Sequence, residues 1–157
     1  MEKIENSVIF FDVDGVLNSW GDRPIRLLNE KNILCLKEIV EQTGARLVCC
    51  STWRKSKPHM ARLVKVLSEH GMELSDIAPF TKTGDRPREV LKWLGRQNIK
   101  ITHFVVLDDD FSEEDYIRWG LGGQVVHTNT YRGGLLDKHI EEAIEILSKE
   151  AVYKRRK

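Results

Sequence analysis

The stretch that decides the fold is VIFFDVDGVLN, residues 8–18, near the start of the chain. Its first four residues are β-branched or aromatic, which indicates a strand buried on both faces. Asp12 and Asp14 follow where this strand should end, and Gly15 comes directly after them. A carboxylate is expensive to desolvate unless it is paired or binds a cation. The stretch therefore predicts a positively charged partner at the end of the first strand.

The composition favours one ordinary domain that is soluble in water. The chain has 157 residues, of which 41% are hydrophobic and 31% are charged, and its net charge is +1. We expect a single domain over residues 1–157, with a core over about 7–148 and a basic tail over 149–157. A net charge this small recruits neither nucleic acid nor an anionic membrane.

The sequence shows no targeting signal, and together with its cysteine usage this predicts a cytoplasmic protein. No apolar stretch approaches the roughly 20 residues of a membrane span, and the charged first residues predict no signal peptide. The three cysteines, Cys35, Cys49 and Cys50, show neither a metal-ligand spacing nor a disulfide framework. Such usage is typical of a reducing compartment.

Apolar runs and helical periods alternate along the chain, which predicts an α/β fold. Strands are expected at residues 7–12, 46–51, 102–109 and 123–128, and helices at 27–42, 59–71, 88–98, 112–120 and 137–150. Strands separated by helices imply a mostly parallel sheet covered on both faces, a Rossmann-like three-layer α/β/α sandwich.

Polar residues gather at the ends of three of these strands. The first ends in Asp12 and Asp14, the second in Ser51 and Thr52, and the third in Asp108, Asp109 and Asp110. Carboxyl ends of parallel strands share one edge of the sheet, where ligands bind. Taken alone, each group could be a turn, a helix cap or a solvated loop. Their joint occurrence favours a site, and oxygen ligands without histidine or cysteine favour Mg²⁺.

These residues resemble the motifs of the haloacid dehalogenase (HAD) superfamily of phosphotransferases. FFDVDGVLN (10–18) is similar to the first motif, LVCCST (47–52) to the second and FVVLDDD (104–110) to the fourth. Basic residues within TKTGDRPREVLKWL (81–94) are candidates for the third. The resemblance runs to about Leu147. The motifs look similar to those of a group of small members without a cap domain, some of which are associated with bacterial RNA-repair systems. This resemblance implies a HAD-like fold without a cap.

The resemblance implies roles for four of the aspartates. Asp12 would be the nucleophile that forms an aspartyl-phosphate. Asp14 would protonate the leaving oxygen and then activate water, and its backbone carbonyl would bind Mg²⁺. Asp109 would bind the metal directly beside Asp12, and Asp108 would support it from behind, although these two could exchange roles.

It also implies residues that bind the phosphoryl group. Ser51 would donate a hydrogen bond to a phosphoryl oxygen, or the neighbouring Thr52 would do so instead. Arg86 would balance the charge of the nucleophile and the transferred group, with Lys82 as the next candidate. Gly15 would admit the substrate close to the backbone.

Aromatic and basic residues near these motifs are candidates for the rim of the site. Trp20, Trp53 and Arg54 could line it and stack on a base, or could pack between loop and helix. Tyr131 and Arg132 could approach it from a later loop, or could form an ordinary turn.

The sequence therefore predicts a magnesium-dependent phosphomonoester hydrolase. The partner would be a phosphorylated substrate and not a membrane, and a nucleotide or nucleic-acid end is a candidate because an uncapped rim suits large substrates. A phosphotransferase could use the same aspartyl-phosphate, and a non-catalytic HAD-fold binding module would keep the fold without turnover. A phosphoacceptor signalling domain is disfavoured, because there the acid pair comes first and a lone phosphoacceptor aspartate later.

Overall fold

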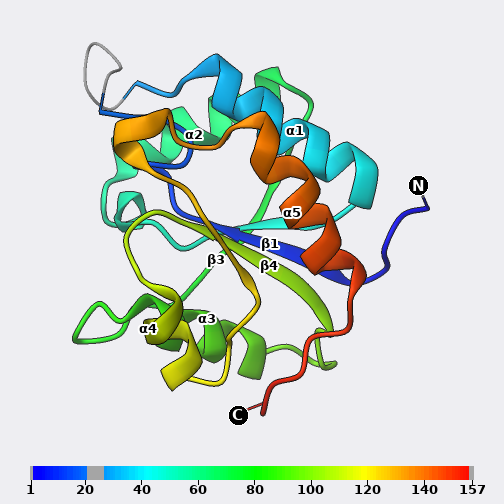
Figure 1. The fold of residues 1–157 in the computed structure, drawn as a ribbon. Helices are drawn as coiled ribbons and strands as arrows, with labels where there is room; N and C mark the ends of the chain where they lie inside the picture. Colours follow the sequence, from blue (N-terminus) through cyan, green and yellow to red (C-terminus); the bar gives the residue numbers. More distant parts are fainter. Residues whose placement is uncertain (1, 21–26, 156–157) are drawn as a thin grey trace.

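The computed structural model describes residues 2–20 and 27–155 and shows an α/β sandwich (Figure 1). Its strands are β1 (Ser7–Phe11), β2 (Arg46–Cys49), β3 (Leu74–Ile77), β4 (His103–Asp108) and β5 (Val125–His127). The helices are α1 (Glu30–Thr43), α2 (Lys57–Glu69), α3 (Arg86–Gly95), α4 (Glu113–Arg118) and α5 (Asp137–Ser148), with the short 3₁₀ turns η1 (Thr52–Lys55) and η2 (Thr130–Arg132). The expected Rossmann-like architecture is confirmed.

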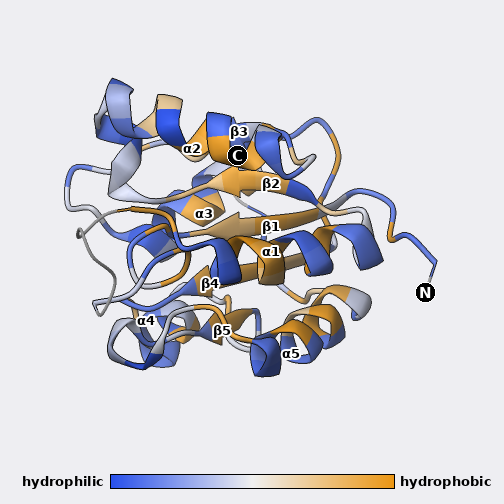
Figure 2. Cartoon of the chain, turned by 90° about the horizontal axis from the view of Figure 1, so that it is seen from above, coloured by the Kyte–Doolittle hydropathy of each residue, from blue (hydrophilic) through white to orange (hydrophobic). Residues whose placement is uncertain are grey.

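The sheet is parallel and has the strand order β3-β2-β1-β4-β5. Helices α1, α2 and α5 cover one face and α3 and α4 the other (Figure 1). Side chains of β1 alternate between the two cores, with Ile9 and Phe11 on the first face and Val8 and Phe10 on the second. Figure 2 shows the hydrophobic strands between helices whose outer sides are hydrophilic. This burial on both faces is what the opening stretch predicts.

The register of the sheet places the first acidic residues side by side. Phe11 pairs with Cys49 of β2 and with Leu107 of β4. One residue further, the Asp12 N–H donates to the Leu107 carbonyl at 3.0 Å, so Asp12 lies beside Asp108. The strand order reverses at β1, between β2 and β4, and such a switch point opens a crevice at the carboxyl ends.

Strand β3 and the start of α1 differ from the sequence expectation. The edge strand β3 is not predicted, because its residues are mostly exposed and form no apolar run. Helix α1 begins at Glu30 and not at 27, since the Asn29 side chain accepts hydrogen bonds from the first turn and caps it there. Within the described residues no inserted domain covers the sheet edge, and residues 21–26 of the short segment after Asn18 lie outside them.

The core extends beyond the boundary expected at residue 148. Ala151 and Tyr153 are buried, and the Tyr153 hydroxyl donates to the Ile101 carbonyl at 2.6 Å. The Ala151 N–H donates to the Thr102 carbonyl. The start of the basic tail is thus part of the packed structure. In the part of the chain that the structure describes, no helix is both long and apolar enough to cross a bilayer.

A buried ion pair joins the η1 turn, which follows β2, to the first turn of α3. The Arg54 guanidinium donates to Glu89 Oε1 at 2.7 Å, and both side chains are almost wholly buried. Glu89 Oε2 also accepts hydrogen bonds from the backbone N–H and hydroxyl of Thr81. Because Glu89 lies in the first turn of α3, the pair fixes where that helix starts.

Replacing Glu89 by alanine should lower the free energy of unfolding by about 3–5 kcal/mol, because a buried guanidinium loses its partner. For a chain of this size the Tm should fall by roughly 6–20 °C, which calorimetry would measure. Glu41→Ala is the matched control, since Glu41 pairs with Lys37 on the surface at 3.7 Å. Equal Tm values for the two variants would contradict the role given to the buried pair.

Candidate active site

Three carboxylates converge at the carboxyl ends of the two central strands. Asp12, Asp108 and Asp109 each offer one oxygen, and these oxygens all lie within 4.8 Å of one another. Asp12 is 4% exposed and Asp108 is fully buried, whereas Asp109 is half-buried. Such a cluster is unstable without positive charge close by.

Arg86 supplies one positive charge from the first turn of α3. Its Nη1 donates to Asp12 Oδ2 at 3.1 Å and to Asp108 Oδ1 at 2.7 Å. Its Nε donates to the Cys50 carbonyl at 3.1 Å, at the end of β2. The two acids raise the pKa of Arg86 although its burial lowers it, so the guanidinium stays charged. Lys82, the other candidate for this position, is exposed in the preceding loop and does not line the cavity described below.

Asp108 is already fully engaged with protein donors. Its Oδ2 accepts from the Tyr116 hydroxyl at 2.6 Å, and its Oδ1 accepts from the Asp110 N–H at 2.9 Å as well as from Arg86. Burial and the neighbouring carboxylate raise the pKa of Tyr116 well above its usual value, so its hydroxyl remains a donor. This arrangement favours Asp108 as a supporting residue over Asp108 as a direct metal ligand.

Asp109 lies instead against the backbone of the first motif. A Cβ on Gly15 would fall 1.8 Å from Asp109 Oδ2, and Gly15 has a φ of +82°. Both the contact and the backbone conformation require glycine at this position. The glycine of the opening stretch therefore makes room for the carboxylate that directly follows β4 as well as for a turn.

The charges of the cluster do not balance. Burial raises the pKa of Asp12 to about 8, against the lowering effect of Arg86, and Asp108 and Asp109 raise it further. Burial likewise raises the pKa of Asp109 to about 6. Among the described residues Arg86 is the cation that pairs with the cluster, and it bonds to only two of the three carboxylates, Asp12 and Asp108. The set has oxygen ligands only. Both features fit a hard divalent cation held by Asp12 and Asp109.

Asp14 differs from the other acids because it is exposed. Asn18 Nδ2 donates to its Oδ1 at 3.0 Å, and the Trp53 indole N–H donates to both of its oxygens at 3.2 Å. The turn that carries it is fixed by the Gly15 N–H, which donates to Asn18 Oδ1, and by the Thr128 hydroxyl, which donates to the Gly15 carbonyl at 2.7 Å.

A cavity of about 280 Å³ opens over this cluster. Its lining residues are Asp12, Asp14, Thr52, Arg86, Asp109, Asp110 and Thr130. Ser51 is fully buried and its Oγ accepts from the Trp53 backbone N–H, whereas Thr52 lines the cavity. Of the two hydroxyls predicted to meet a phosphoryl group, the geometry favours Thr52.

Arg54 requires a correction, because it is not available to a substrate. Its guanidinium donates to Glu89 and to the carbonyls of Ser51, Ala78 and Pro79. Its side chain is 2% exposed. Arg54 therefore ties loops together and does not bind the substrate as predicted.

The sequence reasoning missed four residues around the cluster, and it left the position of Trp53 open. The four missed residues are Asn18, Tyr116, Thr128 and Thr130. Asn18 and Tyr116 donate hydrogen bonds to aspartates, Thr128 fixes the turn at Gly15, and Thr130 lines the cavity. Asn18 stands within the first motif and Thr128 ends a predicted strand, so both carried a signal. Tyr116 carried none, because its contact with Asp108 depends on how α4 packs.

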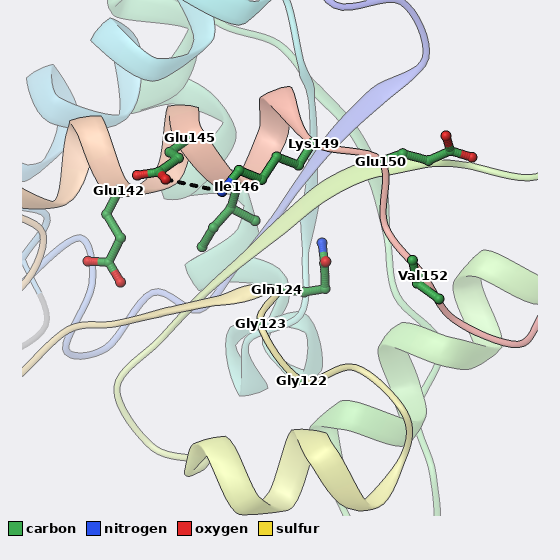
Figure 3. Close-up of a pocket in the computed structure, with 9 residues that line it drawn as sticks. All are labelled: Gly122, Gly123, Gln124, Glu142, Glu145, Ile146, Lys149, Glu150 and Val152. Carbon is green, nitrogen blue, oxygen red and sulfur yellow. Dashed lines mark hydrogen bonds and ion pairs between the residues drawn. The ribbon is translucent and has the colours of Figure 1, made fainter.

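The cavity over the aspartate cluster is not distinguished from other cavities by its volume. A larger hollow of about 440 Å³ lies between the end of α5 and residues 122–124, which precede β5 (Figure 3). It is therefore at the opposite edge of the sheet from the aspartates. Its lysine, Lys149, already pairs with Glu145 at 3.2 Å.

Comparison with known proteins agrees with this geometry. The family model of the HAD domain in Swiss Army Knife RNA repair proteins matches residues 8–140. The chain belongs to this family. The matched range of the HAD domain runs from β1 into α5 and so contains every member of the cluster. No curated protein and no solved structure gives a significant match. The family supports a HAD-type phosphoesterase, and the aspartate cluster fits the divalent metal that such enzymes usually use.

The metal-free HAD domain should lose stability as the pH rises from about 4 to 8. Asp12 and Asp109 have a pKa of 3.8 when unfolded and of about 8 and about 6 when folded, so the folded state holds protons that the unfolded state releases. Thermal unfolding in EDTA should show this fall, and Asp12→Asn should make it shallower. Added Mg²⁺ should raise the Tm more at pH 8 than at pH 5. A metal-free Tm that rises across this range would contradict the charge imbalance.

Proposed function

We propose that this HAD domain is a magnesium-dependent phosphomonoester hydrolase that works through an aspartyl-phosphate on Asp12. The observation that carries the proposal is the position of the Asp12 carboxylate. It lines a cavity open to solvent and is bound by Arg86. One of its oxygens also lies within 4.8 Å of an Asp109 oxygen, so that both could bind the same cation. A phosphoryl group in this cavity would meet a nucleophile and a fixed positive charge at once.

In the first step an oxygen of Asp12 attacks phosphorus, and the bond to the leaving oxygen breaks. Arg86 compensates the charge on the transferred oxygens, and the Thr52 hydroxyl donates a hydrogen bond to one of them. Asp14 gives its proton to the leaving oxygen. In the second step Asp14 takes a proton from water, which attacks the aspartyl-phosphate and frees phosphate and Asp12.

The metal would be held by side-chain oxygens of Asp12 and Asp109 and by the backbone carbonyl of Asp14, as the resemblance implies. When bound, Mg²⁺ supplies the positive charge that keeps Asp12 ionised at neutral pH and offsets charge on the phosphoryl group. Asp108 serves this arrangement by holding Arg86 and the start of the following loop.

Solvent access favours hydrolysis over transfer to an alcohol. Asp14 is exposed and lines the same cavity as Asp12, so water reaches the residue that would activate it. Within residues 2–20 and 27–155 no inserted domain shields it.

Asp12→Asn should abolish magnesium-dependent release of phosphate from p-nitrophenyl phosphate, because an amide oxygen is a poor nucleophile. Phosphate release should fall at least about a thousandfold, and the wild-type protein should lose its activity in EDTA. Glu145→Gln, an exposed carboxylate on α5, should be unaffected. Full turnover by Asp12→Asn would rule out covalent catalysis at this residue, and an inactive wild-type protein would favour a binding module.

The substrate class that we propose is a nucleotide or a nucleic-acid end. Trp20 and Tyr131 are 58% and 76% exposed, and their ring centroids lie 6.1 Å apart. The backbone N–H of Trp20 donates to the backbone carbonyl of Thr130, a residue that lines the cavity. The backbone of Trp20 thus adjoins the lining of the cavity, and we infer that the two exposed rings are near enough for a base attached to the phosphate to stack on them.

Replacing both Trp20 and Tyr131 by alanine should raise the KM for a nucleoside monophosphate by roughly tenfold, since stacking contributes about 1–3 kcal/mol per base. The KM for ribose 5-phosphate, which has no base, should be unchanged. Ile99→Ala is the control, because Ile99 is 55% exposed and precedes β4 at the opposite edge of the sheet. Equal KM changes for both substrates would contradict base stacking.

A further inference from the structure

Trp53 contacts a residue that the chemistry needs, although its ring lies outside the cavity of the aspartate cluster. It is 3% exposed, and its side chain packs beside His59 with ring centroids 4.7 Å apart. Its indole N–H donates to Oδ1 and Oδ2 of Asp14 at 3.2 Å each. A buried indole N–H needs an acceptor, and here that acceptor is an exposed carboxylate at the mouth of the site.

Two independent donors fix this carboxylate. Besides the indole, Asn18 Nδ2 donates to Asp14 Oδ1 at 3.0 Å. An exposed aspartate ordinarily rotates freely about its side-chain bonds, so two donors give it an orientation that burial does not provide. Among the described residues Oδ1 accepts from both donors and Oδ2 only from the indole, which leaves Oδ2 as the oxygen freer to exchange a proton.

The backbone fixes Trp53 as firmly as its side chain does. Trp53 follows the end of β2 by four residues, and Ser51 Oγ accepts its backbone N–H at 3.1 Å. The Arg54 guanidinium next to it donates to the Ser51 carbonyl and to Glu89. The backbone of Trp53 is therefore fixed close to the end of β2, and its indole is buried in the core beside His59 of α2, from where it reaches a residue on an exposed turn.

We propose that Trp53 is a positioning residue that orients the Asp14 carboxyl group for proton transfer. This inference rests on the proposed phosphatase function. When the bond between phosphorus and the leaving oxygen breaks, the electron pair stays on that oxygen and the Asp14 proton moves to it. When water then attacks the aspartyl-phosphate, its proton returns to Asp14. Trp53 takes no part in either transfer but keeps the carboxyl group aimed at the cavity.

The leaving group of the substrate provides the test. An alkyl alcohol leaves only if it receives a proton, whereas a nitrophenolate leaves without one, so only alkyl phosphates need a well-aimed acid. Trp53→Phe keeps a buried ring but removes the N–H. Because Asp14 also activates the water of the second step for every substrate, the first step is measured alone, as release of the leaving group in a single turnover. For Trp53→Phe this rate should fall about tenfold or more with an alkyl phosphate and less than about threefold with p-nitrophenyl phosphate. A general acid contributes about 10²–10⁴-fold, so a misaimed one should lose part of this.

Trp93→Phe is the matched control. Trp93 is also 3% exposed, and its indole N–H also donates to an aspartate, Asp76, at 2.8 Å. That pair lies outside the cavity, so loss of its N–H should change both substrates by the same small factor. If Trp53→Phe does not fold, as circular dichroism would show, Asn18→Ser removes the other donor and carries the same comparison.

Asp14→Asn separates failure of this inference from failure of the proposed function. In the same single-turnover measurement of leaving-group release it should show the same selectivity as Trp53→Phe, only larger. If Asp14→Asn loses alkyl activity selectively and Trp53→Phe loses both activities equally, or neither, the positioning role is overturned and the function stands. If Asp14→Asn itself shows no selectivity, the acid–base role of Asp14 falls, and the role of Trp53 falls with it.

Discussion

The site depends on the bridge that Arg86 forms between Asp12 and Asp108. These two carboxylates end neighbouring strands, and both are almost wholly removed from water. Without the guanidinium they would face each other unpaired, and removing one partner of a buried ion pair costs about 3–5 kcal/mol. Because Arg86 begins α3, the same contact also fixes that helix at the carboxyl edge of the sheet. Charge compensation and helix placement are therefore one constraint in this protein.

That constraint leaves the acids unequal. Asp108 has its oxygens filled by Arg86, Tyr116 and a backbone N–H, so it has little capacity for a metal or a substrate. Asp12 keeps contact with the cavity, and Asp109 lies against Gly15 at its edge. Three acids of similar intrinsic chemistry are thus separated by their hydrogen-bond partners. The proposed supporting and metal-binding roles rest on this separation more directly than on the order of the residues in the chain.

Much of this arrangement could be predicted from the sequence, for identifiable reasons. The apolar run before Asp12 is long enough to mark a strand buried on both faces, and parallel strands must bring their carboxyl ends to one edge. The sequence could not show that Arg54 turns inward to Glu89, because a charged residue beside a motif can point either way. The edge strand β3 was missed since its mostly exposed residues form no apolar run. Tyr116 was missed because nothing local connects it to Asp108.

The spacing of Asp12 and Asp14 explains how neighbouring carboxylates could take different roles. In a continuing strand, residues two apart would share one face and one environment. Here β1 ends at Phe11, and the N–H groups of Val16 and Leu17 donate to the Val13 carbonyl, which forms a turn. Asp12 therefore stays in the buried end of the sheet, where its pKa is raised, and Asp14 is carried out to solvent. Different surroundings are what allow two acids to divide nucleophilic and proton-transfer work. The turn after β1 produces that difference within three residues.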